Sequence, residues 1–100
     1  MIKILRVIGR SLEPDFRDGD YVLVSRIPFF FRPARHGDVV AFHKPPYGLL
    51  IKRVEYRTPA GELFVLGTHA ASVDSLQFGP IRGQDLLGKV IGHVKKPGRE

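Results

Sequence analysis

Short strand-like runs separated by turn signals fill most of the 100-residue chain, and this pattern constrains the fold more than any other feature. The runs are rich in aliphatic and β-branched residues, and they are shorter than a typical helix. They cover residues 2–8, 20–26, 38–43, 49–57, 62–66 and 86–94. Pairs such as Asp18-Gly19 and His36-Gly37, which favour tight turns, stand between them. The pattern predicts a mainly β domain whose strands form one bent sheet or a partly closed barrel.

The length and composition predict a single domain over residues 1–100. Hydrophobic residues make up 43% and charged residues 26% of the chain, which is typical of a globular protein with a packed core. The sequence shows no long helical period, no internal repeat and no linker. The chain has no cysteine, so neither a disulfide nor a thiolate metal site is part of the design.

The apolar runs and the N-terminal residues bear on location. No apolar run approaches the roughly 18 residues that a spanning helix needs. The start, MIKILRVIGRS, is too short and too charged for a secretory signal. We therefore expect a soluble protein of the cytoplasm.

The net charge of +6 raises the question of a nucleic-acid partner, because clustered Lys and Arg attract phosphate. The basic residues are scattered along the chain, and only Lys95, Lys96 and Arg99 gather near its end. The sequence therefore predicts no nucleic-acid partner.

Two residues could carry chemistry, and each has an ordinary structural explanation. Ser11 begins a polar segment that contains Pro14, and such a serine commonly caps a single helical turn. Alternation along a strand puts Lys52 on the same face as Leu50, Val54 and Tyr56. A lysine there either snorkels, with its ammonium in water, or is desolvated, which lowers its pKa and lets it accept a proton. The local sequence leaves both alternatives open for each residue.

Motifs spread over nearly the whole chain favour the catalytic interpretation of both residues through a resemblance to a known family. In their order and spacing they resemble the conserved boxes of the signal peptidase and LexA-like peptidases. The matching blocks are GRSLEP (9–14) with DGDYV (18–22), RHGDVVAF (35–42), IKRV (51–54) and GTHAASVDSLQFG (67–79).

The resemblance implies a β domain of that type and a Ser–Lys dyad, with Ser11 as nucleophile and Lys52 as general base. A serine hydroxyl needs a neighbouring base to remove its proton as it attacks, and a neutral lysine amine serves in place of histidine. The resemblance also implies that Ser72 orients Lys52, that Asp74 braces the loop, and that the Ser11 backbone N–H donates to the oxyanion. For Ser72 and Asp74, ordinary turn capping is the alternative. No cofactor is implied.

The chain departs from the family pattern at several positions. Gly9 stands where some signal peptidases have a side-chain hydroxyl, so only backbone donors are expected at the oxyanion. Thr68-His69 replaces Asp-Asn, and Leu76 replaces an arginine. The four histidines, His36, His43, His69 and His93, match no tight metal-ligand spacing, so no metal site is predicted. His69 is the only histidine that we consider as an alternative base.

The short length indicates which branch of these peptidases the chain resembles most. The chain shows neither the N-terminal membrane helix and large extra β region of many signal peptidases nor the DNA-binding domain of LexA-like members. It resembles most the small soluble peptidases that mature nickel-type superoxide dismutases. This implies a protein or peptide substrate with a cleavable N-terminal extension.

A non-catalytic β module of the same fold, which binds peptide or a membrane surface, is the alternative function. Its support is the segment 27–33, IPFFFRP, in which three aromatic residues stand near arginines. Packing of some rings in the core is the simpler explanation, so membrane association is possible but not predicted.

Overall fold

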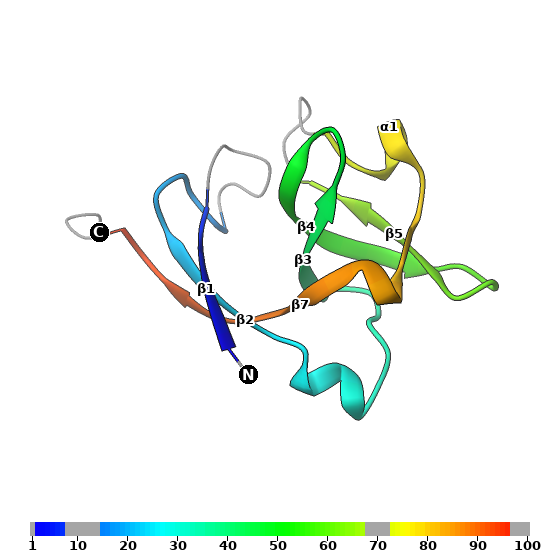
Figure 1. Cartoon of the computed structure of the whole chain (residues 1–100), viewed down its shortest axis with the longest axis horizontal. Coiled ribbons are helices and arrows are strands. Elements are labelled where there is room, and N and C mark those ends of the chain that lie inside the picture. The colour runs from blue at the N-terminus through cyan, green and yellow to red at the C-terminus, as the bar shows by residue number, and fades with distance from the viewer. Residues whose placement is uncertain (1, 8–14, 68–72, 97–100) are drawn as a thin grey trace.

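The computed structural model describes residues 2–7, 15–67 and 73–96. Seven strands form one antiparallel sheet in the order β1-β2-β7-β3-β4-β5-β6, with β1 and β6 at its edges (Figure 1). The mainly β, single-sheet architecture is as predicted, and the sheet is bent but open rather than closed into a barrel. The strands are β1 (Ile2–Arg6), β2 (Tyr21–Ser25), β3 (Val39–Lys44), β4 (Gly48–Arg57), β5 (Glu62–Leu66), β6 (Ile81–Arg82) and β7 (Leu86–Val94).

The helical parts of the described residues are three short turns. They are η1 (Ile27–Phe30), α1 (Ser75–Phe78) and η2 (Gly83–Asp85). None was predicted at its place, and neither was the two-residue strand β6. The helical turn expected at Ser11 lies outside the described residues. No helix within the ranges given above is long and apolar enough to cross a membrane.

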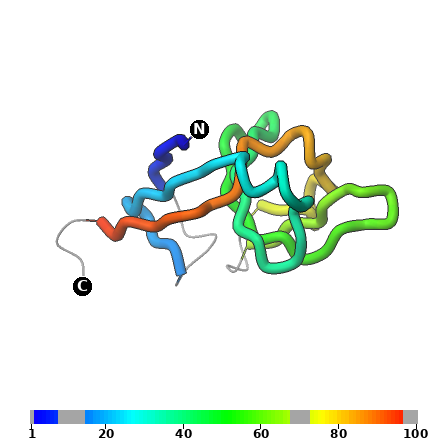
Figure 2. The backbone as a smooth tube through the Cα atoms, turned by 90° about the horizontal axis from the view of Figure 1, so that it is seen from below, coloured from blue at the N-terminus to red at the C-terminus, as the bar shows by residue number. Residues whose placement is uncertain are grey.

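The core consists of two hydrophobic clusters on opposite faces of the sheet, and β3 contributes to both. Val40 and Phe42 belong to one cluster and Ala41 to the other, and all three are fully buried. Figure 2 shows β2 and β7 side by side. The C-terminal part of β7 pairs with β2, and its N-terminal part pairs with β3. The first cluster contains Ala34, Val40, Phe42, Val54, Leu63, Val65, Ile81 and Leu86, and the second contains Val7, Val22, Val24 and Ala41.

The strand alternation predicted for β4 holds only up to a β-bulge. The register shifts between Val54 and Tyr56, which leaves Glu55 as the extra residue. Val54 is fully buried, but Tyr56 is exposed and stacks on Phe64 with ring centroids 5.1 Å apart. Tyr56 therefore does not share the buried face of Lys52, and the expectation that it would was wrong.

Two turns of the pattern R-x-G-D-x-V, at 17–22 and 35–40, have the same hydrogen bonds, so the chain does contain a short local repeat. In each, the aspartate side chain accepts from the N–H three residues earlier, at 3.1 Å for both Arg17 to Asp20 and Arg35 to Asp38. Both carboxylates are buried.

Each turn also forms two backbone hydrogen bonds with one residue from elsewhere in the chain. The first turn holds Val7, whose N–H donates to Asp20 O at 2.7 Å and whose carbonyl accepts from Gly19. The second turn holds Val54 in the same way through the Asp38 carbonyl, at 2.7 Å, and the Gly37 N–H. Val7 precedes the segment of Ser11, and Val54 follows Lys52 by two residues, so the two turns hold the flanks of both predicted catalytic residues.

Candidate active site

Lys52 is buried in the sheet. It lies opposite Val40 of β3, in the part of β4 that leads to Val54, and only 2% of it is exposed. This exposed fraction agrees with a desolvated lysine and not with one whose ammonium snorkels into water.

Burial is also the main influence on the pKa of the Lys52 amine. Loss of hydration lowers the pKa of Lys52 below its ordinary value, and the negative charge of Asp74 partly opposes this by raising it. The balance increases the fraction of neutral amine at a given pH. A neutral amine is the form that accepts a proton from a serine hydroxyl.

Asp74 is held by backbone donors on both sides of the segment 68–72. It is 5% exposed and forms the N-cap of α1, accepting from the Leu76 N–H at 3.0 Å. Its Oδ2 accepts from the Gly67 N–H at 3.1 Å, and its own N–H donates to the Gln77 side chain at 2.9 Å, completing a capping box. Asp74 is therefore a helix cap that also joins the two ends of this segment.

Ser75, which the sequence analysis did not single out, fixes α1 to the sheet. Its side chain is buried, and its Oγ accepts from the Val65 N–H in β5 at 2.9 Å. The only signal for it in the sequence is its place beside Asp74 in the last matching block. Ser75 thus fixes to the sheet the helix that Asp74 caps, and the charge of Asp74 acts on the Lys52 amine.

Ser11, Ser72 and His69 lie outside the described residues, so the predicted contact between Ser11 Oγ and Lys52 Nζ stays a prediction. Both flanks of the Ser11 segment are described. Val7 lies in the second hydrophobic cluster, and Asp15 accepts from the Arg53 guanidinium at 2.9 Å. Because Arg53 is the neighbour of Lys52, the C-terminal end of the segment is tied to the strand that carries the proposed base. The sequence analysis missed this role of Arg53.

Two histidines have structural partners instead of a place in this site. A ring nitrogen of His93 lies 2.7 Å from an Asp20 carboxylate oxygen, and a ring nitrogen of His36 lies 2.6 Å from the Glu55 carbonyl oxygen. In the part of the chain that the structure describes, no three His, Asp or Glu side chains gather as a metal-binding group.

Comparison with known proteins identifies the family of this chain. The family model described as "Signal peptidase, peptidase S26" matches residues 1–55, a range that contains both Ser11 and Lys52. The chain is also similar to "Signal peptidase I V" of Bacillus subtilis (strain 168), with 24% identity over 136 aligned positions that cover 85% of this chain and 81% of the relative. Since the family model matches more than half of the chain, the protein belongs to the signal peptidase family, peptidase S26.

Proposed function

We propose that the chain is a serine endopeptidase that removes an N-terminal leader or propeptide from a partner protein, with Ser11 as nucleophile and Lys52 as general base. Family membership supports leader removal by a serine peptidase in general. The observation that carries the dyad is the burial of Lys52, which lowers its pKa and so increases the fraction of neutral amine near neutral pH.

The chemistry follows from these two groups. Ser11 Oγ attacks the scissile carbonyl carbon while the neutral Lys52 amine takes the hydroxyl proton. The oxyanion that forms accepts a hydrogen bond from the Ser11 backbone N–H, as such intermediates require a preplaced donor. The Lys52 ammonium then protonates the leaving amine, and water hydrolyses the acyl-enzyme with Lys52 again as base. Ser72 orients Lys52 in this scheme, and Asp74 keeps the loop in place.

The finer proposal concerns the substrate. The resemblance of the last block, at 67–79, to that of the nickel-type superoxide dismutase maturation peptidases favours a nickel-type superoxide dismutase precursor, whose new amino terminus would then bind the metal. A non-catalytic β module remains the competing function, and cleavage of a propeptide distinguishes the two.

The test incubates purified protein with a peptide that spans a candidate propeptide junction and follows cleavage by mass spectrometry. Ser11→Ala and Lys52→Ala should each lower the rate on the order of a millionfold, because the two groups act as one unit. Lys52→Arg should be equally inactive, since a guanidinium does not lose its proton. Lys44→Arg is the matched control on the neighbouring strand and should cleave normally. Near-normal turnover by Lys52→Arg would show that Lys52 is not the base.

The pH profile gives a second test of the base. The rate should rise with pH as Lys52 loses its proton, with a midpoint below that of an ordinary lysine. Because the Asp74 charge raises the Lys52 pKa, Asp74→Asn should move this midpoint to lower pH. Asparagine is also a good N-cap, which protects α1. A midpoint that moves upward in Asp74→Asn would contradict the charge argument.

A further inference from the structure

A pocket of about 240 Å³ opens beside the turn of the β4–β5 hairpin. Three parts of the chain that are distant in sequence line it: η1 with the segment after it, the end of the hairpin, and η2 with the start of β7. Figure 1 shows these parts, in cyan, green and orange, on the side of the molecule away from the C-terminus. The pocket therefore depends on the tertiary fold and has no local signal in the sequence.

The floor of this pocket is apolar. Leu63 is 2% exposed and Leu86 is 3% exposed, and both belong to the first hydrophobic cluster. Phe29 adds an aromatic ring that packs against the same cluster, so the expectation that a ring of the segment 27–33 packs in the core holds for Phe29. Such a floor gives water few hydrogen-bond partners and favours an apolar group in the pocket.

Two arginines line the same pocket. Arg26 donates to the Leu86 carbonyl through one of its guanidinium nitrogens, and a guanidinium has five N–H donors, so others remain for a ligand. Neither Arg26 nor Arg57 forms an ion pair with an acidic residue that the structure describes, and no described Asp or Glu lines the pocket. Asp85 of η2 pairs with Arg82 instead, at 3.7 Å. Two cations beside one pocket without a carboxylate favour an anionic ligand.

We propose that this pocket binds a small organic carboxylate, with its apolar body on Phe29 and Leu63 and its carboxylate at the guanidinium groups of Arg26 and Arg57. The planar fork of a guanidinium matches the two oxygens of a carboxylate. The volume is below the range of sites for drug-sized ligands, so it suits one ring or one branched chain with a short acid arm. Inorganic phosphate would satisfy the arginines but leave the apolar floor in water. The inference uses no residue of the peptidase proposal and does not depend on it.

The first experiment follows the backbone amide signals of the isotope-labelled protein by NMR during three titrations. The ligands are hydrocinnamate, its uncharged amide of the same shape, and inorganic phosphate, each added to about 10 mM to cover millimolar affinity. Hydrocinnamate should shift the signals of Gly61 and Gly83, which line the pocket, and the shifts should saturate. The amide lacks the charge and phosphate lacks the apolar body, so each should bind at least about tenfold more weakly.

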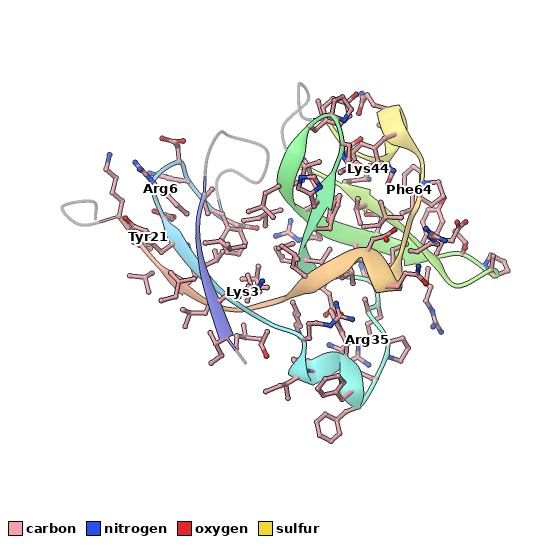
Figure 3. All side chains as sticks on the ribbon, viewed as in Figure 1. Lys3, Arg6, Tyr21, Arg35, Lys44 and Phe64 are labelled. Atoms are coloured by element: carbon pink, nitrogen blue, oxygen red, sulfur yellow. The ribbon has the colours of Figure 1, made fainter. Side chains whose placement is uncertain are left out.

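Arginine variants test the anionic end of the pocket. Arg57→Gln and Arg26→Gln should each weaken hydrocinnamate binding about tenfold, because each removes a charge-assisted pair of hydrogen bonds. Arg57→Lys keeps the charge but not the fork, so it should cause a smaller loss, about threefold. Arg35→Gln is the matched control, because Arg35 is an exposed arginine on the segment that joins η1 to β3 and does not line the pocket (Figure 3). It should bind within about twofold of the unchanged protein, since solvent screens its charge.

Four outcomes would overturn the proposal. If Arg57→Gln bound hydrocinnamate as the unchanged protein does, the guanidinium would not hold the carboxylate. Equal binding of the amide and the acid would remove the need for charge, and equal binding of phosphate would reduce the pocket to a plain anion site. A loss in Arg35→Gln as large as that in Arg57→Gln would show that the general positive charge of this side, and not the pocket, attracts the ligand.

Discussion

The two R-x-G-D-x-V turns have one backbone design but different partners for their carboxylates. Asp20 accepts from the Lys96 backbone N–H at 2.9 Å and lies 2.7 Å from a His93 ring nitrogen, so its partners include a backbone amide and an imidazole. Asp38 accepts from both Arg32 nitrogens, at 2.9 and 3.1 Å, and lies 3.4 Å from Lys89 Nζ. The second turn, which holds the strand of Lys52, therefore has an arginine and a lysine on its carboxylate, whereas the ion pair described for the first turn is with a histidine.

The difference shows which part of the motif sets the geometry. Arg17 and Arg35 contribute their backbone N–H groups to the turns, and Gly19 and Gly37 have φ of +91° and +92°. These features are common to both turns, so they suffice for the shape. The side-chain partners instead determine how strongly the turn is held and how it responds to pH.

Asp38→Asn should cause the largest loss of stability. It removes the charge that two cations and a backbone N–H share, and breaking such a buried pair costs about 3 kcal/mol, the low end of the usual range because both cations are partly exposed. The free energy of unfolding in urea measures it. A loss under about 1 kcal/mol would mean that water replaces the carboxylate and that the backbone alone holds the turn.

Asp20→Asn should cost less, about 2 kcal/mol, because an amide still accepts one of the hydrogen bonds that Asp20 makes. One of the donors, the Arg17 N–H, the Lys96 N–H or His93, then meets an NH₂ group instead of an oxygen. The same urea titration applies. If this variant lost more stability than Asp38→Asn, the charged partners would not be what distinguishes the two turns.

Lowering the pH should remove the contribution that the Asp38 carboxylate makes to the free energy of unfolding. Burial raises the pKa of Asp38, but hydrogen bonds from Arg32 and the Arg35 N–H, with the charges of Lys89 and Arg32, outweigh it and hold the pKa below its ordinary value. This stabilisation is complete above the unfolded pKa of about 3.9 and is lost as pH falls through the lower folded value. The stability difference between the unchanged protein and Asp38→Asn should therefore persist at pH 5 to 7 and shrink below about pH 4. A difference that stayed constant to about pH 2 would contradict the charge account.

The two turn glycines, Gly19 and Gly37, should show the smallest difference in stability between the turns. Gly19→Ala and Gly37→Ala should each cost about 1 kcal/mol, because an L side chain is strained at these positive φ values. An added Cβ at Gly37 meets nothing within 4 Å, whereas at Gly19 it lies 2.8 Å from Lys96 Cδ. Gly19→Ala should therefore cost a few tenths of a kcal/mol more, a small excess because the lysine chain is flexible. Thermal melting of both variants measures the difference, and Gly19→Ala with Lys96→Ala should remove it.

Much of the sheet could be predicted from the sequence because alternation and turn residues are local signals. The runs at 62–66 and 86–94 match β5 and β7 in full, and the other predicted strands that are described differ from β1 to β4 at their ends. The bulge at Glu55 could not be predicted, since it depends on pairing with β5. β6 is only two residues long and exists because it pairs with β5, so its sequence carries no periodic signal.

Of the candidate site, the described residues include Lys52 and Asp74, and the roles predicted for them stay predictions. The burial of Lys52 follows from its apolar strand neighbours, although the sequence alone left snorkelling open. The ion pair of Arg53 with Asp15 joins residues 38 positions apart, and the bond of Ser75 to Val65 depends on how α1 meets the sheet. Such contacts need the tertiary arrangement, and no local pattern contains them.

The position of β3 in both hydrophobic clusters makes the two halves of the molecule interdependent. Val40 and Phe42 on one face and Ala41 on the other are carried by the same short strand, so melting either cluster exposes apolar surface of its neighbour. We expect a single cooperative unfolding transition and no stable fragment on either side of β3. New termini for a circularly permuted chain therefore belong in the turn at 58–61, because residues 59–61 are exposed and a cut there leaves β3 joined in sequence to its partner β4.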